Sequence, residues 1–245
     1  MTEVVVPAAV LVVAAFVQGV AGFGFGMVAM GLLPLVLPLT VAVPAVAVLG
    51  GLSNAAVLAE NRGGLRRDAV LPLLAGAFVG VPLGVLFLHE ADPRLVERAL
   101  GIALVLYALH GLLARTAGSG APPVASRWRD GVGAVAGSLG GVLGGAFNTG
   151  GPPVVLYVAW RRYPPAVVKA ALQCFFLVST AYQLALFAAS GTLSETALRT
   201  AAVGLPSLGV GLFAGIALGR RLDAAAFRRV VLVVLLVLGI RFLAV

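Results

Sequence analysis

The sequence contains few charged residues and few of the side chains that most enzymes use for catalysis. Only 11% of its 245 residues are Asp, Glu, Lys or Arg, whereas a soluble domain contains about 25%. A single cysteine, Cys174, excludes an intrachain disulfide and a cysteine metal cluster. No cluster of His, Glu and Asp supports a metal site, and no serine or cysteine has a base close to it in sequence. We therefore expect no metal, no other cofactor and no enzymatic activity.

Apolar residues are abundant instead. They make up 61% of the chain, and the mean hydropathy is +1.09. Four segments approach the ~20 apolar residues needed to cross a bilayer, at residues 69–88, 166–189, 200–218 and 230–245. Glu3 precedes the first apolar segment without a basic region, which favours a retained helix over a cleaved signal peptide. We predict an all-α, polytopic integral membrane protein whose surroundings are the lipid bilayer.

The net charge of +8 could indicate a nucleic-acid partner in a soluble protein. Here the basic residues lie in short patches between apolar segments and do not alternate with aromatic residues. This pattern is typical of the charges that set membrane topology. We therefore expect no nucleic-acid partner.

The most informative stretch is residues 137–153, GSLGGVLGGAFNTGGPP. Asn148, Thr149, Gly150 and Gly151 are followed there by two prolines, which cannot donate backbone hydrogen bonds. A continuous membrane helix is disfavoured, and a break in hydrocarbon survives only where protein or a water-filled cavity satisfies its backbone. We predict a break at mid-depth followed by a short helix. The N-terminus of such a helix carries free N–H groups and about half a positive charge, which suits an anion.

The first half of the chain has a counterpart at residues 19–26, GVAGFGFG, with Gly22, Gly24 and Gly26. Glycine at these positions permits close backbone approach, although tight helix packing explains it equally well. The GxxGxG spacing is not a dinucleotide fingerprint, because no βαβ unit surrounds it.

The two halves look like copies of one unit. At an offset of 131, two glycines fall on glycines, Asp92 on Asp223, and Arg98 on Arg229; at an offset of 122, Gly19 falls on Gly141. Repeated halves are common in transporters. We predict a first half at 1–116 (hairpin 4–38, helices 42–60, 69–89 and 95–113), a cytoplasmic linker at 117–130, and a second half at 131–245 (hairpin 131–161, helices 165–189, 197–219 and 226–244).

Two topologies distribute the 17 Lys and Arg residues differently. Eight simple crossings place eight inside and nine outside, which is no bias. If each broken region is a hairpin that returns to its own face, and the N-terminus is outside, the division is thirteen inside to four outside. Three crossings per half then make the repeat inverted, with both termini outside. A variant in which the first arm of each hairpin crosses most of the membrane stays open.

Polar residues inside apolar helices are candidate ligands, although hydrogen bonds between helices are the usual alternative. Gln18, Asn54 and Gln173 are the candidates that we favour. Glycines also recur every four residues, at 76, 80 and 84 and at 211, 215 and 219, and we interpret these as helix-packing positions.

The sequence resembles the sulfite exporter TauE/SafE family of bacterial permeases, also called the toluenesulfonate uptake permease family. The resemblance rests on GxxGFGxG at residues 19–26 and on GGxxGG at 140–145 leading to GGPP at 150–153, and it spans nearly the whole chain. It implies a transporter of sulfite, sulfonate, thiosulfate or sulfoacetate in the bacterial inner membrane. Asn148 and Thr149 are more polar than the glycines often found at their positions in the family.

We therefore expect a permease that moves a small sulfur-containing or organic anion by alternating access. The alternatives are an anion-selective channel that uses the breaks as a filter and, least favoured, a membrane-embedded enzyme. A homodimer is left open. The candidate substrate-binding residues are Asn148, Thr149, Gly150, Gly151, Gly22, Gly24, Gly26, Asn54, Gln173 and Gln18.

Overall fold

The computed structural model describes residues 2–113, 126–219, 221 and 223–244, and all its regular elements there are helices. They are α1 (Thr2–Ala21), α2 (Phe25–Leu32), α3 (Leu39–Asn61), α4 (Arg67–Glu90), α5 (Pro93–Leu113), α6 (Ser126–Phe147), α7 (Gly151–Trp160), α8 (Pro165–Ala189), α9 (Glu195–Gly219) and α10 (Ala224–Leu243), with 3-10 turns at Leu33–Leu35 and Arg62–Gly64. The all-α prediction is confirmed.

Five helices in the described part of the chain are long and apolar enough to cross a membrane, namely α3, α4, α5, α8 and α9. Their outer faces carry large apolar side chains that are more than half exposed, such as Phe78, Val79 and Phe213. Exposed apolar faces mark membrane or protein contacts, and faces on helices of this length and hydropathy mark the membrane. The prediction of a polytopic membrane protein is confirmed.

Both glycine-rich stretches interrupt the helices. Helix α1 ends at Ala21 and α2 begins at Phe25, whereas α6 ends at Phe147 and α7 begins at Gly151. The backbone at the breaks enters the left-handed region, with φ of 79° at Gly22, 108° at Gly24 and 54° at Asn148. Glycine and asparagine tolerate this region best, so local sequence and local geometry agree.

The two arms of each hairpin differ in length. The first arms, α1 and α6, have 20 and 22 residues, whereas α2 and α7 have 8 and 10. At about 1.5 Å per residue a first arm is about 30 Å long, close to the thickness of the bilayer core. The first arms are therefore long helices, and the variant in which each crosses most of the membrane stays a prediction.

Two boundaries differ from the sequence expectation. Residues 126–130 were placed in the linker but form the start of α6, and the rest of that linker, 117–125, lies outside the described residues. Only Ala91 and Asp92 separate α4 from α5, although a longer loop was expected. Asp92 accepts a hydrogen bond from the Arg94 N–H at 2.9 Å, and Pro93 opens the helix. This N-cap starts α5 two residues early.

Helix packing crosses between the halves. The most extensive contacts join α4 to α6 and α1 to α9, followed by α5 with α10 and α3 with α8. The helices that correspond in the two halves are α1 and α6, α3 and α8, α4 and α9, and α5 and α10. If each helix is exchanged for its counterpart, the α4–α6 pair becomes the α9–α1 pair, and the α5–α10 and α3–α8 pairs map onto themselves. This pattern is what a duplicated unit produces, while the inverted sense of the repeat stays a prediction.

The α4–α6 and α1–α9 contacts are the two main packing seams, and glycines make their close approach possible. A Cβ on Gly80 would overlap the backbone of Ser138 in α6, and one on Gly211 would overlap the Val12 carbonyl in α1. The neighbours one turn away, Gly76, Gly84 and Gly215, are equally close to the opposite backbone. The interpretation of these glycines as small-residue packing positions is confirmed.

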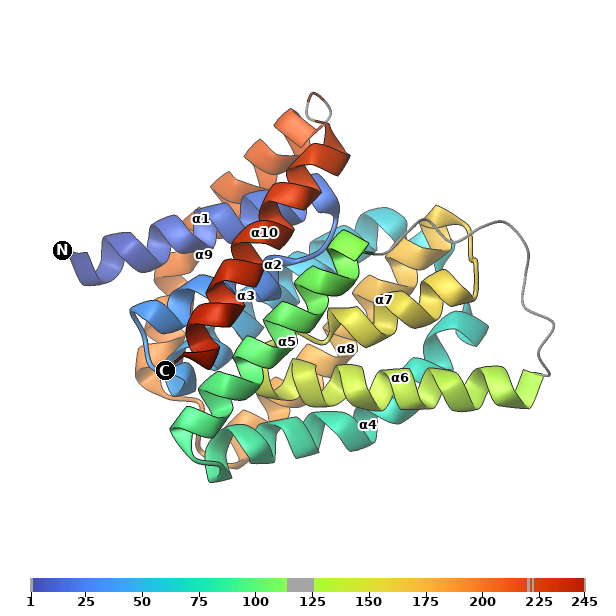
Figure 1. Ribbon diagram of the computed structural model, residues 1–245, viewed down its shortest axis with the longest axis horizontal. Helices are drawn as coiled ribbons and strands as arrows, with labels where there is room; N and C mark the ends of the chain where they lie inside the picture. Colours follow the sequence, from blue (N-terminus) through green and yellow to red (C-terminus); the bar gives the residue numbers. More distant parts are fainter. Residues whose placement is uncertain (1, 114–125, 220, 222, 245) are drawn as a thin grey trace.

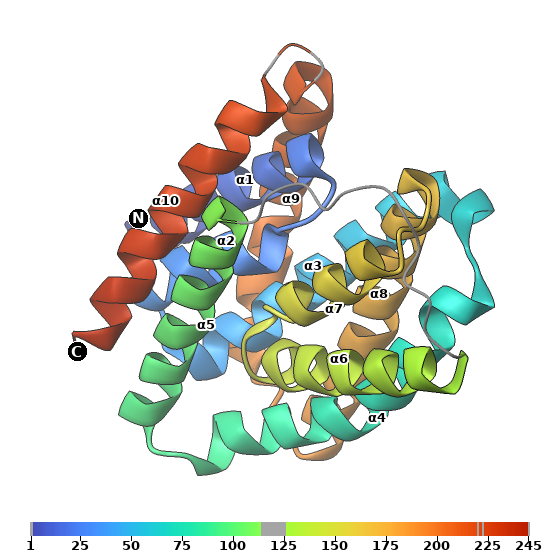
Figure 2. The same cartoon turned by 45° about the vertical axis from the view of Figure 1, so that its right-hand side comes forward.

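The turns that join the helices gather at two ends of the molecule. In both views the α7–α8 and α3–α4 connections lie toward the right, and the α4–α5 turn lies at the bottom (Figure 1, Figure 2). The hairpin topology assigns the first two connections, which are rich in arginine, to one face. The arrangement agrees with that assignment, and the cytoplasmic identity of the face stays a prediction.

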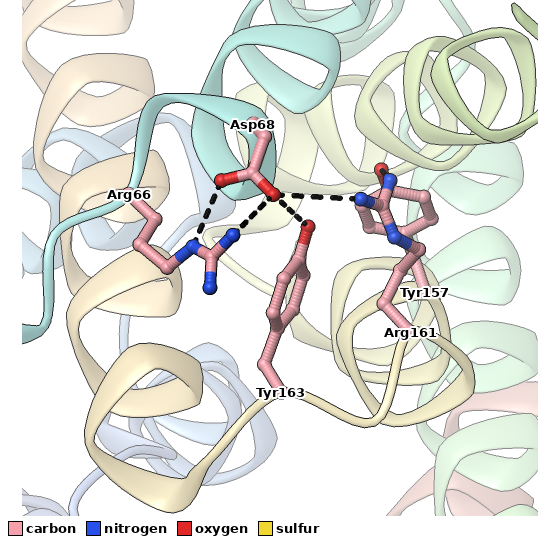
Figure 3. Close-up of polar contacts among 5 residues, drawn as sticks. All are labelled: Arg66, Asp68, Tyr157, Arg161 and Tyr163. Carbon is pink, nitrogen blue, oxygen red and sulfur yellow. Dashed lines mark hydrogen bonds and ion pairs between the residues drawn. The ribbon is translucent and has the colours of Figure 1, made fainter. Parts of the chain in front are cut away.

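A polar cluster ties the halves together at the start of α4 (Figure 3). Asp68 forms two 3.0 Å hydrogen bonds with Arg66 and accepts one of 3.1 Å from the Tyr163 hydroxyl. Arg161 lies 3.7 Å from the same carboxylate and donates to the Tyr157 hydroxyl at 2.7 Å. Tyr163 lies in the turn between α7 and α8, where burial raises its pKa to about 12, so the phenol is a proton donor at neutral pH.

Candidate functional site

A cavity of about 50 Å³ lies where the two helix breaks meet. Residues of α1, α2, α3, α6, α7 and α8 line it, so both halves of the chain contribute. Seven of the ten candidate ligands are among the lining residues: Gln18, Gly24, Gly26, Asn54, Asn148, Gly150 and Gly151. The remaining three, Gly22, Thr149 and Gln173, lie beside the cavity and do not line it.

The breaks touch each other directly. A Cβ on Gly26 would overlap the carbonyl oxygen of Asn148, so only glycine allows this approach. The contact brings the N-terminus of α2 and the N-terminus of α7 to one cavity. Among the hydrogen bonds of the described residues, none uses the N–H of Gly26 or of Gly151. Two helix ends therefore present unpaired backbone donors beside the same space.

Gln18 holds the first break in place. Its Oε1 accepts a hydrogen bond from the Phe25 N–H at 2.9 Å, which caps the start of α2. Its Nε2 donates to the Ser53 hydroxyl at 2.7 Å and more weakly to the Asn54 Oδ1 at 3.4 Å. The side chain is only 2% exposed, so each of these polar atoms needs its partner. Gln18 thus connects α1, α2 and α3 at the edge of the cavity.

Amide side chains satisfy carbonyl groups around both breaks. Asn148 donates to the Val43 carbonyl at 2.8 Å, and Gln173 donates across the repeat to the Gly22 carbonyl at 2.7 Å. Gln183 donates to the carbonyls of Gly144 and Gly145, at 3.1 and 2.9 Å. The NH₂ groups are therefore occupied by backbone, as buried polar groups must be in lipid.

Thr149 faces away from the cavity. Its N–H and its hydroxyl both bond to the Leu143 carbonyl, at 3.2 and 3.4 Å, and close the last turn of α6. Gly22 plays the same part at the end of α1, because its N–H donates to the Gln18 carbonyl at 2.7 Å. Both residues therefore stabilise a break through hydrogen bonds to the preceding helix and do not line the cavity.

Helix α8 supplies a polar face that the candidate ligands did not include. Ser179, Thr180 and Gln183 line the cavity at a helical spacing of three to four residues, which is the signal that could have placed them there. Ser179 is 6% exposed, and its Oγ has no hydrogen-bond partner in the structure. A buried hydroxyl without a partner beside a cavity is available to a ligand.

The rest of the lining is mainly apolar and aromatic. The rings of Phe23, Phe25, Phe175 and Phe176 border the cavity, and none of its lining residues carries a charge. The site therefore combines neutral hydrogen-bond donors with apolar walls. Such a site suits a small anion that carries an organic group.

The profile of a family described as Sulfite exporter TauE/SafE matches residues 7–242, nearly the whole chain. This chain belongs to the sulfite exporter TauE/SafE family. It is similar to the probable sulfite/organosulfonate exporter TauE of Cupriavidus necator, with 31% identity over 229 residues, covering 91% of this chain and 87% of the relative. No solved structure matches the chain.

The family assignment confirms the resemblance found in the sequence. A TauE/SafE protein is a transporter and not an enzyme. Together with the five apolar spanning helices, it identifies a multi-pass protein of the bacterial inner membrane.

Proposed function

We propose that this TauE/SafE protein moves a small sulfur oxyanion, such as sulfite or a short organosulfonate, by alternating access. The observation that carries the proposal is the meeting of two helix N-termini, those of α2 and α7, at one cavity formed by both halves. The relative from Cupriavidus necator, named as a sulfite/organosulfonate exporter, supports this class of cargo.

The anion binds between the breaks. Its oxygens accept hydrogen bonds from the free N–H groups at Gly26 and Gly151 and from the Ser179 hydroxyl, and the two helix dipoles favour its negative charge. An organic substituent contacts the phenylalanine rings. Because every donor is neutral, the bound anion can leave again, whereas a buried arginine partner would hold it more tightly.

Transport follows from movement of one half against the other. The two breaks come from the two repeats, so rocking the repeats opens the same site first to one face and then to the other. In this proposal the repeats are inverted and the termini lie outside.

The direct test is flux of labelled sulfite, thiosulfate and a short sulfonate into proteoliposomes. Ser179→Ala removes one donor to the anion and should lower kcat/KM about tenfold or more, because a hydrogen bond to a charged group contributes about 1.5–3 kcal/mol. The matched control is Ser207→Ala, since Ser207 is a buried serine of α9 that does not line the cavity. Equal activity of the two variants would contradict the role of Ser179.

Two further outcomes bear on the proposal. Asn148→Ala removes the hydrogen bond to the Val43 carbonyl and loosens the second break, so saturable transport at the wild-type rate would remove Asn148 from the site. Flux that rises linearly with concentration and never saturates would favour a channel over alternating access.

A further inference from the structure

A second cavity, of about 270 Å³, lies beside the first, among α1, α2, α5 and α10. Phe23, Gly24 and Met27 line both cavities. This short segment, the first break and the start of α2, is therefore the wall between them.

The second cavity combines an apolar lining with one cation. Most of its lining residues are aliphatic, for example Val20, Val231 and Leu235, and the polar exceptions are Tyr107 and Arg228. In the described part of the chain no acidic side chain forms an ion pair with Arg228. The guanidinium is thus available to an anion, while the aliphatic walls suit a hydrocarbon group.

A third cavity shows the contrast. It lies between the start of α1 and α9 and includes Arg199, but that arginine is paired with Glu195 at 2.6 Å. This cavity shares no lining residue with the space between the breaks. Of the second and third cavities, only the one with Arg228 adjoins the proposed substrate site.

The wall between the two joined cavities is the non-helical segment between α1 and α2. Gly22 and Gly24 flank Phe23, and both have positive φ, at 79° and 108°. Two glycines in this conformation leave Phe23 outside any helix, so a change of its backbone angles would break no helical hydrogen bond.

We propose that the second cavity is an access site for an organosulfonate, at which Arg228 binds the sulfonate group and the aliphatic walls hold the organic group. Phe23 then separates this site from the cavity between the breaks and swings aside to admit the anion. Arg228 follows the α9–α10 turn, which the topology places on the cytoplasmic face, so the access site serves cargo that leaves the cell. The inference rests on the proposed function, because it assumes that the first cavity is the transport site.

The first experiment measures the site without transport. In a Cys174→Ala background, Val231→Cys places a thiol in the second cavity, and purified protein in detergent is labelled with methanethiosulfonates that carry a sulfonate or a quaternary ammonium group. Relative to their rates with a free thiol in solution, the anionic reagent should be favoured about fivefold over the cationic one when Arg228 is present. Arg228→Gln should abolish this preference, and Arg229→Gln, whose side chain does not line the cavity, should keep it. Toluenesulfonate should slow the labelling.

Several labelling outcomes would overturn the access site. They are absence of labelling, a preference that survives Arg228→Gln, and protection by an anionic phospholipid but not by toluenesulfonate. The last would assign the cavity to a lipid.

The second experiment measures transport of the sulfonate in proteoliposomes. Arg228→Gln should raise KM about fivefold on the side that the α9–α10 turn faces and leave kcat nearly unchanged, while Arg229→Gln should match wild type. If wild type carries no sulfur anion, the proposed function fails. If wild type transports but the two arginine variants are alike, only the access site fails.

Discussion

Gly26 is the residue on which the contact between the two breaks depends. Its Cα faces the Asn148 carbonyl so closely that no side chain fits, although the same helix end must leave its N–H groups open. The nearby Gly50 also lines the cavity, but a Cβ there would meet the Phe25 ring at an ordinary 3.5 Å. Two glycines of one cavity therefore differ in what they tolerate.

Gly26→Ala should push the breaks apart. Overpacking in a closed site costs about 1–3 kcal/mol, and the displaced helix ends would no longer share one ligand. We expect loss of saturable flux in proteoliposomes and a lower unfolding temperature in detergent. Gly50→Ala is the control and should leave the flux and the unfolding temperature nearly unchanged. Equal behaviour of the two variants would contradict the contact between the breaks.

At the scale of elements, local signals predicted much of the structure. The helix breaks follow from glycine, asparagine and proline at adjacent positions, and the packing seams follow from glycine every four residues. The polar face of α8 was harder to predict. Gln183 bonds to carbonyls 38 and 39 residues away, and no periodicity reveals whether such an amide caps a break or meets a ligand. The early start of α5 follows from a local signal, an Asp92 N-cap with Pro93 at the first helical position.

Helix α9 offers a comparison of two glycines on opposite faces. A Cβ on Gly211 would overlap α1, whereas one on Gly209 would meet nothing within 4 Å. Gly211→Ala should therefore destabilise the protein by about 1–3 kcal/mol, and Gly209→Ala should be neutral or stabilising by about 0.5–1 kcal/mol. Thermal unfolding in detergent measures both. Because of the repeat, Gly80→Ala in α4 should behave like Gly211→Ala, and a neutral result there would argue against equivalent seams.

At the scale of the whole molecule, the Asp68 cluster joins α4 of the first half to the α7–α8 turn of the second (Figure 3). Asp68→Asn keeps the size of the side chain but removes the counter-charge of Arg161, whose side chain is 11% exposed. Solvent screening at Asp68 limits the expected loss of stability to about 1 kcal/mol. Glu195→Gln removes the highly exposed pair with Arg199 and should have no measurable effect in the same assay.

The Tyr163 hydrogen bond should persist throughout the physiological range. Burial raises its pKa to about 12, above the ordinary value of 10, so the folded protein holds this proton more tightly than the unfolded chain. Its effect on stability is constant below about pH 10 and becomes unfavourable as the pH rises toward 12. Unfolding temperatures of wild type and Tyr163→Phe should therefore differ by a constant amount from pH 6 to 9.

The charge state of the cavity between the breaks predicts how transport responds to voltage. No ionised side chain lines it, so no protein charge offsets the charge of a bound anion during its passage. Flux in proteoliposomes should rise when a potassium gradient with valinomycin makes the compartment that receives the anion positive. Equal flux at zero and at 100 mV would show that a counter-charge travels too.

If the proposed transport moves the anion without a counter-charge, the membrane potential of the cell drives it outward. A resting bacterium keeps its interior negative, and each elementary charge that leaves gains about 2.3 kcal/mol per 100 mV. Under the proposed function, export of a sulfur anion would then require no other energy source, and a doubly charged anion would gain twice the free energy of a singly charged one.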